Sequence, residues 1–247
     1  MKDAVSGVDI IVHEAAFVSV PQSMDEPQSC FDVNITGTSL LFDVARRAGV
    51  KRAIVASSAA VYGDSDAMPL AEETPLRPLS PYAVSKLAVE KYLFFFRQTH
   101  GLPYVALRYS NVYGPRQDPF GEAGVVAIFC QKMWRNETPT INGQGGQTRD
   151  FVYAADVARA NLLALGEDVQ GEINIATGVE TSVNTVFRIL REATGATVEE
   201  RHGPPMPGEQ MRSVLDARRA EKVMGWKPRF SIKDGLLLTA DFFRPAS

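Results

Sequence analysis

The chain alternates short apolar runs with stretches of helical periodicity, and this alternation restricts its fold more than any other feature. The compact apolar runs lie at residues 8–12, 52–57 and 104–109. Stretches with helical periodicity lie between these runs, at about residues 29–48 and 81–99. Continuous apolar strands of this kind are typical of a parallel sheet that is buried on both faces. The order therefore predicts an α/β fold, a doubly wound parallel sheet with right-handed crossovers.

The regular alternation ends after Gly114, where proline and glycine become frequent. The Pro- and Gly-rich stretches are 114–124, 139–146 and 203–208. Such stretches are typical of loops and insertions, and a pattern of helix and strand returns after residue 151. We therefore expect 1–113 and 151–177 to form the sheet domain. The remaining segments, 114–150 and 178–247, are expected to form a smaller C-terminal substrate-binding lobe.

Three side chains indicate a site for moving a proton on or off an alcohol. Tyr82 and Lys86 lie four residues apart in a predicted helix and so share one face. A neighbouring cation lowers the pKa of a phenol, which is near 10 when unperturbed. Ser58, at a predicted strand end, can hydrogen-bond the same substrate oxygen. A tyrosine and a lysine at this spacing are usually surface residues, but Ser58 and the helix start at Ser80-Pro81 favour chemistry.

Composition and charge exclude several classes of function. The 247 residues are 45% hydrophobic and carry a net charge of −3 without a basic stripe, which argues against nucleic-acid binding. The apolar runs are too short to span a bilayer, so no membrane partner is expected. Cys30 and Cys130 lie far apart and fit buried thiols of a cytoplasmic protein. The histidines, His13, His100 and His202, are scattered and indicate no metal site.

A series of short motifs covers nearly the whole chain. It comprises His13-Glu14-Ala15-Ala16, Asn34 with Gly37-Thr38, the Ser-Ser-Ala-Ala-Val-Tyr-Gly run at 57–63, Tyr82 with Lys86, the runs 108–116 and 147–153, Asn174-Ile175 and Gly225-Trp226. In content and order, this series resembles the extended short-chain dehydrogenase/reductase family of NAD-dependent epimerases and dehydratases, and most of all its UDP-glucose and UDP-N-acetylglucosamine 4-epimerases. A single Tyr-x-x-x-Lys pair is common in unrelated chains, whereas this ordered series is specific.

The resemblance implies a Rossmann-like NAD-binding sheet and an isomerase that inverts C4 of a nucleotide sugar. Tyr82 would take the proton of the sugar 4-hydroxyl, Ser58 would be the catalytic serine, and Lys86 would also hold the nicotinamide ribose. NAD would carry the hydride, giving a transient 4-keto sugar. The implied substrate is a UDP-hexose or a UDP-N-acetylhexosamine.

Further site residues follow from the same motifs. The resemblance implies cofactor contacts from Ala15, Ala16, Asn34, Ser57, Tyr82, Lys86 and Tyr109. It implies substrate contacts from Ser19, Ser58, Asn111, Arg149, Arg212 and Ser213.

Some of these residues also have plainer explanations. Close packing explains Ala15 and Ala16 equally well. An asparagine inside a helical stretch is unfavourable, so Asn34 is expected to have a functional or bridging role. A loop arginine is usually solvated, but arginine suits bidentate phosphate contact, and Arg149 stands within a family motif.

The chain departs from related families at two places. Ala59 and Ala60 stand where the sugar dehydratases and decarboxylases place an acid beside the catalytic serine, so epimerisation is favoured over these two reactions. An acid from Asp64 or Asp66 is the alternative, although both lie beyond the strand end. A related nucleotide-sugar reductase remains an alternative.

The second departure lies in the C-terminal part. Met206 replaces a cation that relatives place before Pro-Gly-Glu, which puts one phosphate contact in doubt unless Arg212 compensates. Ser213 aligns with a position near the hexose 2-substituent. A serine there leaves room for an N-acetyl group, although it could equally be a surface residue.

The sequence contains neither Gly-x-Gly-x-x-Gly nor the Gly-x-x-Gly-x-x-Gly of the extended family. The strand at 8–12 corresponds to the fourth strand of the doubly wound order, so we expect it to be an exposed edge. We expect an N-terminal truncation of roughly two strand–helix units, about 60 residues at 30 per unit. A non-catalytic remnant that keeps a nucleotide-sugar pocket is therefore an alternative to an active enzyme.

Phe94, Phe95 and Phe96 follow one another in the predicted helix that carries Tyr82. Three consecutive residues cannot all face one core at 3.6 residues per turn, so one or two should be exposed or in an interface. Family members pair through this helix and the helix at 29–48. A homodimer is therefore expected, with burial inside one chain as the alternative.

Overall fold

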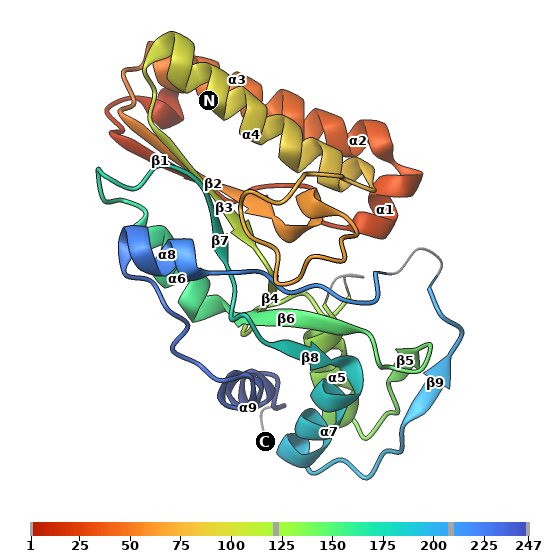
Figure 1. Ribbon diagram of the computed structural model, residues 1–247. Coiled ribbons are helices and arrows are strands. Elements are labelled where there is room, and N and C mark those ends of the chain that lie inside the picture. The colour runs from red at the N-terminus through yellow and green to blue at the C-terminus, as the bar shows by residue number, and fades with distance from the viewer. Residues whose placement is uncertain (1, 121–123, 207–209, 246–247) are drawn as a thin grey trace.

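The computed structural model describes residues 2–120, 124–206 and 210–245 and has a four-stranded parallel sheet with helices on both faces (Figure 1). The strand order is β1 (Ile10–His13), β2 (Arg52–Ser58), β3 (Tyr104–Tyr109) and β7 (Gly171–Ile175). Each neighbouring pair is parallel. The predicted α/β fold with a Rossmann-like parallel sheet is confirmed.

The remaining elements complete the chain between and after these strands. The helices are α1 (Val20–Asp25), α2 (Pro27–Phe31), α3 (Thr38–Arg47), α4 (Pro81–His100), α5 (Val125–Trp134), α6 (Ala154–Leu163), α7 (Val183–Thr194), α8 (Arg218–Met224) and α9 (Ile232–Phe242). The other strands are β4 (Asn111–Tyr113), β5 (Thr140–Asn142), β6 (Thr148–Tyr153), β8 (Glu180–Ser182) and β9 (Arg201–Gly203). Short 3-10 turns lie at Asp3–Val5 and Ala59–Tyr62, and a π-helical segment at Asp32–Gly37.

Alternate side chains of the central strands pack on opposite faces of the sheet, as the geometry of a strand requires. Ala53 and Val55 of β2 pack with α3 and α4, in a cluster that includes Phe42. Ile54 of β2 packs on the other face with α6 and with Trp226 after α8. The residues of β2 from Arg52 to Ser57 are all buried. Burial on both faces explains why the strand reads as a continuous apolar run.

A second group of elements forms around β4, β6 and β8, with α5, α7 and α9 (Figure 1). Its apolar cluster includes Phe129, Phe151, Phe187 and Leu236. The division of the chain into a sheet domain and a smaller lobe stays a prediction. Three elements pack differently from the predicted boundaries. Strand β4 lies within 1–113 and β6 crosses the boundary at residue 151, yet both pair in the second sheet, and α8 packs against β7.

The first strand lies at the edge of the sheet, as predicted, with Val12 48% exposed. It spans Ile10–His13 rather than 8–12, because Val8 donates its backbone N–H to Val5 in a turn. The helix predicted at 29–48 is continuous but contains the π-helical segment. Such segments often occur at functional sites.

Helix α4 presents aromatic side chains to solvent. Phe96 is buried, whereas Phe94 and Phe95 are 53% and 48% exposed. The prediction that one or two of the three phenylalanines are exposed is confirmed.

Among the helices of the described residues, none combines the length and the apolar character that a membrane crossing needs.

Candidate active site

Helix α4 brings two of the predicted catalytic residues to the sheet. Ser80 caps its N-terminus by accepting a hydrogen bond from the N–H of Ala83 (3.1 Å), and Pro81 occupies the first turn. The helix ends at Gly101 in the left-handed conformation. Between these ends, Tyr82 and Lys86 share one face.

The end of β2 brings Ser58 to the same place. Ser58 follows the last buried residue of the strand, and its hydroxyl accepts a hydrogen bond from the N–H of Ala60 (3.2 Å) at the start of the 3-10 turn. Gly63 ends that turn with φ +61°, and a Cβ there would collide with the carbonyl oxygen of Arg77. The Ser58 hydroxyl lies close enough to the Tyr82 phenol to oppose the rise in the pKa of that phenol, so two of the three residues are brought together.

The pKa of Tyr82 differs in direction from the prediction made for it. Desolvation raises the pKa of its phenol, and the hydrogen bond with Ser58 opposes that shift. The Lys86 ammonium lies 5.8 Å from the centre of the Tyr82 ring. The predicted lowering of the phenol pKa by Lys86 was therefore wrong in this structure, because loss of solvent outweighs the favourable contacts.

Lys86 is buried, with 6% of the residue exposed, and its Nζ donates a hydrogen bond to the carbonyl of Ala56 (2.9 Å). Desolvation lowers the pKa of Lys86 to about 8, while the negative charge of Glu14 acts in the opposite direction. Burial therefore shifts both groups toward their neutral forms, while an amine with a pKa of about 8 remains mostly protonated at pH 7.

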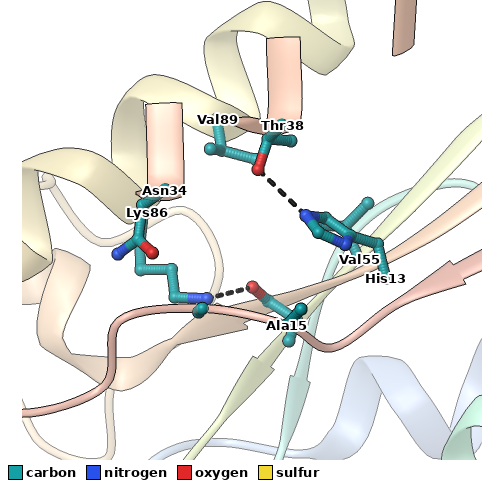
Figure 2. A pocket seen from close by; sticks show the side chains of 9 residues that line it. His13, Ala15, Asn34, Thr38, Val55, Lys86 and Val89 are labelled. Atoms are coloured by element: carbon teal, nitrogen blue, oxygen red, sulfur yellow. Dashed lines mark hydrogen bonds between the residues drawn. The ribbon is translucent and has the colours of Figure 1, made fainter. Parts of the chain in front are cut away.

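A recess next to Lys86 gathers several predicted cofactor residues (Figure 2). Its lining residues are His13, Ala15, Ala16, Asn34, Thr38, Val55, Ala56, Lys86 and Val89. His13 Nε2 and Thr38 Oγ1 lie 2.9 Å apart across it, as a dashed line in Figure 2 marks. Burial lowers the pKa of His13, so the imidazole is held in its neutral form.

Asn34 bridges three parts of the site, which confirms its predicted bridging role. Its amide accepts a hydrogen bond from the N–H of Phe17 (2.7 Å) and donates to the carbonyl of Phe17 (3.0 Å). It also donates to the hydroxyl of Ser85 (2.8 Å), one residue before Lys86. The π-helical segment places this side chain, so the loop after β1 is tied to α4.

The recess has the chemistry of a site for the nicotinamide end of NAD. Ala15 and Ala16 leave space beside the backbone, Val55 and Val89 supply apolar walls, and Lys86 and Asn34 supply polar groups. The residues present therefore fit part of this cofactor.

Two further predicted cofactor residues bind protein groups through their side chains. The Ser57 hydroxyl donates to Glu90 (2.6 Å). The Tyr109 hydroxyl donates to Glu14 (2.9 Å) and accepts from Asn161 (2.8 Å). Cofactor contacts of Ser57 and Tyr109 stay predictions.

Sequence reasoning did not single out Glu14 or Glu90, which both lie beside predicted catalytic residues. Glu14 stands within a quoted motif, and its carboxylate acts on the pKa of Lys86. Glu90 follows Lys86 by four residues on the same helix face, a spacing that is visible in the sequence. This spacing was the sequence signal from which a role of Glu90 beside Lys86 could have been predicted.

The predicted substrate residues lie in several elements, and their contacts with substrate stay predictions. Ser19 caps α1 by accepting from the N–H of Gln22 (3.1 Å), and Asn111 is exposed on β4. Arg149 lies on β6, where its Nη1 donates to the carbonyl of Thr148 (2.9 Å). Ser213 is 6% exposed, so the alternative of a surface serine is wrong.

Arg212 forms a bidentate ion pair with Glu180, with two N–O distances of 2.8 Å. The Glu180 carboxylate therefore occupies the guanidinium of Arg212, which was the candidate to replace the phosphate-binding cation that is absent at Met206. Met206 itself is exposed, and the Pro-Gly-Glu that follows it, at 207–209, lies outside the described residues.

Comparisons with known proteins place this chain among relatives of known family. The profile of the NAD dependent epimerase/dehydratase family matches residues 1–176. A putative UDP-glucose 4-epimerase of Methanocaldococcus jannaschii is 45% identical over 93% of this chain and 75% of its own length.

Solved structures resemble the whole fold. UDP-glucose 4-epimerase of Thermotoga maritima, determined with UDP-glucose, has a TM-score of 0.93 at 44% identity and matches 96% of this chain and 77% of its own. UDP-N-acetylglucosamine 4-epimerase of Methanobrevibacter ruminantium, in complex with UDP-N-acetylmuramic acid, has a TM-score of 0.94 at 35% identity. It matches 98% of this chain and 78% of its own.

The lowered pKa of Lys86 predicts a pH-dependent cost to folding. Because the folded-state pKa of about 8 lies below the ordinary value of 10.5, the unfolded chain binds more protons between these values. The free energy of unfolding attributable to Lys86 therefore rises as pH increases through this window. Lys86→Met removes this pH dependence. The free energy of unfolding of the variant minus that of the wild type should therefore fall by about 1 kcal/mol between pH 7 and pH 9.

Urea unfolding of both proteins at the two pH values measures this change. Lys91→Met, at an exposed position of the same helix, corrects for the general effect of removing a lysine charge. A difference between wild type and Lys86→Met that stays constant with pH contradicts the lowered pKa.

Proposed function

Because the chain belongs to the NAD-dependent epimerase/dehydratase family, we propose that it inverts the configuration at C4 of a UDP-hexose through a transient 4-keto sugar. The observation that carries this proposal is the meeting of Tyr82, Ser58 and Lys86 at the end of β2. Relatives that are 45% and 44% identical bear the name UDP-glucose 4-epimerase.

Tyr82 is the group that moves the proton. Its phenolate oxygen takes the proton of the sugar 4-hydroxyl as the C4–O bond becomes a carbonyl, and it returns the proton when the alcohol forms again. Ser58 hydrogen-bonds the same substrate oxygen and keeps it in line with the phenol. Lys86 supplies a nearby positive charge that stabilises the phenolate during the transfer.

The recess next to Lys86 is where this chain would hold NAD. Ala15, Ala16 and Asn34 would line the nicotinamide end, and the Lys86 ammonium would hydrogen-bond its ribose. When bound, oxidised NAD supplies a hydride acceptor and a positive charge that lowers the phenol pKa. The raised pKa of Tyr82 in the protein alone keeps the base protonated until a cation arrives, so deprotonation is coupled to occupancy of the site.

Epimerisation is favoured over loss of water or carbon dioxide. Dehydration needs an additional acid to expel the C6 hydroxyl, and Ala59 and Ala60 beside Ser58 carry none. Asp64 and Asp66 are exposed on the segment beyond the 3-10 turn. Neither of them has the position beside Ser58 that related dehydratases fill with an acid.

The uridine diphosphate would be bound by the second group of elements. Arg149 on β6 suits a phosphate because its guanidinium can donate two parallel hydrogen bonds. Asn111 on β4 is exposed near the end of the parallel sheet, which is where ligands of such folds bind. Arg212 would have to leave Glu180 to reach a phosphate.

A homodimer and a cytoplasmic location complete the proposal. Phe94 and Phe95 are half exposed on α4, and covering them by a second copy of α4 would remove apolar area from water. The free, buried thiols of Cys30 and Cys130 suit a reducing compartment. A monomeric mass in sedimentation equilibrium would contradict the dimer.

Turnover of UDP-galactose in the presence of NAD tests the proposed reaction. The purified protein is expected to convert UDP-galactose to UDP-glucose, and Tyr82→Phe is expected to lower the rate by about 10²–10⁴-fold, the usual effect of losing a general base. Nuclear magnetic resonance of the anomeric protons measures both sugars directly.

Two outcomes oppose the proposal. Equal rates for Tyr82→Phe and the wild type would exclude the phenol as the base. Binding of UDP-glucose without any turnover at saturating NAD would favour the alternative of a non-catalytic protein that retains a nucleotide-sugar pocket.

The size of Ser213 predicts the range of substrates. A serine beside the hexose 2-substituent leaves space for an N-acetyl group, so UDP-N-acetylglucosamine should be turned over alongside UDP-glucose and UDP-galactose. In Ser213→Tyr the ratio of kcat/KM for UDP-N-acetylglucosamine to that for UDP-galactose should fall at least about 10-fold, the effect of a steric clash worth about 1.4 kcal/mol. An unchanged ratio in a folded variant contradicts the assignment of Ser213.

A further inference from the structure

An ion pair lies buried behind the candidate active site and has no part in the proposed proton transfer. Arg108 Nε donates to Glu90 Oε1 (2.9 Å), and Arg108 Nη2 donates to Glu90 Oε2 (2.8 Å). The side chains are 4% and 1% exposed. The two planar groups thus face each other in the bidentate arrangement that fixes both distance and orientation.

The pair joins the helix of the active site to the sheet. Glu90 follows Lys86 by four residues and Tyr82 by eight, so all three lie on one face of α4. Arg108 lies on β3, whose parallel register places it opposite Ser57 of β2. Any sliding of α4 along the sheet would break two charge-assisted hydrogen bonds in a buried environment.

The same two side chains also hold the segment around Ser58 from both directions. Ser57, the residue before Ser58, donates its hydroxyl to Glu90 Oε1 (2.6 Å). Tyr62, in the 3-10 turn after Ser58, accepts a hydrogen bond from Arg108 Nη1 (2.9 Å). Tyr62 in turn donates to Asn174 Oδ1 (2.7 Å) on β7, so the turn is anchored to the far strand as well.

Stability alone does not explain this arrangement. A buried ion pair often adds little to the free energy of folding compared with apolar residues of similar volume, because both charges lose their hydration. What such a pair adds is a defined geometry, since each group must meet its partners or leave a buried charge unpaired. Here the geometry that it defines is the approach of α4 to the end of β2.

We propose that Glu90 and Arg108, acting through Ser57 and Tyr62, are positioning residues that hold the hydroxyl of Ser58 within hydrogen-bond reach of the Tyr82 phenol. This inference rests on the proposed function only in naming Ser58 and Tyr82 as the reacting pair. The structural statement concerns the approach of these two side chains in the protein itself. It can therefore be tested without substrate.

Ser57→Ala is the mildest test, because it removes one link and leaves Glu90 paired with Arg108. The reporter is the ¹³Cζ resonance of Tyr82 in protein labelled at that carbon of tyrosine, since this resonance responds to hydrogen bonding of the phenol. Tyr82→Phe identifies the resonance by its disappearance. Ser58→Ala removes the serine hydroxyl outright and so defines the full change.

The Tyr82 resonance of Ser57→Ala is expected to move in the same direction as in Ser58→Ala, by a measurable fraction of that change. At saturating NAD the kcat for UDP-galactose should fall at least 3-fold while the KM for UDP-galactose changes by less than 2-fold, because no predicted substrate-binding residue is changed. Thr239→Val is the matched control. It also loses a buried hydroxyl, which donates to the carbonyl of Gly235 (2.7 Å) within α9, and it should move neither quantity.

An unmoved Tyr82 resonance in folded Ser57→Ala overturns the inference, whatever the turnover. A moved resonance in a protein without turnover supports the inference and counts against the proposed function instead. The double variant Glu90→Leu with Arg108→Met removes the pair without leaving a lone charge and should give a larger shift than Ser57→Ala. A folded double variant with the wild-type resonance also overturns it.

Discussion

The approach of helix α4 to the carboxyl end of β2 is the contact on which the candidate site depends. One helix face carries Tyr82, Lys86 and Glu90, and one strand end carries Ser57 and Ser58. Parallel strands finish at the same edge of a sheet, so the loops and turns that follow them share that edge. The phenol, the amine and the hydroxyl meet there because α4 is held in register with the sheet.

Burial sets the electrostatic state of this site more than the charges nearby do. Desolvation raises the pKa of Tyr82 and lowers that of Lys86 to about 8, so each group is shifted toward its neutral form. In this state the Tyr82 phenol keeps its proton until an additional positive charge lowers its pKa. The proposed cofactor brings such a charge, which links binding to the generation of the base.

Local sequence patterns predict much of the fold, but they do not predict the detailed geometry of the site. The apolar run at 52–57 specifies a strand buried on two faces, and the spacing of Tyr82 and Lys86 specifies a shared helix face. The direction of the Tyr82 pKa shift could not be predicted, because the spacing says nothing about how much solvent surrounds the phenol. The π-helical segment that places Asn34 has no sequence signature, and the partner of Glu90 lies on another element, 18 residues away.

The central claim is that the phenol, serine and lysine serve an oxidation and reduction at C4 of the sugar. UDP-galactose deuterated at C4 tests it most directly when the isolated UDP-glucose product is analysed by mass spectrometry and proton magnetic resonance. The account predicts that the deuterium remains on C4, because the hydrogen leaves and returns as a hydride that does not exchange with water. UDP-glucose with solvent-derived hydrogen at C4 would contradict it.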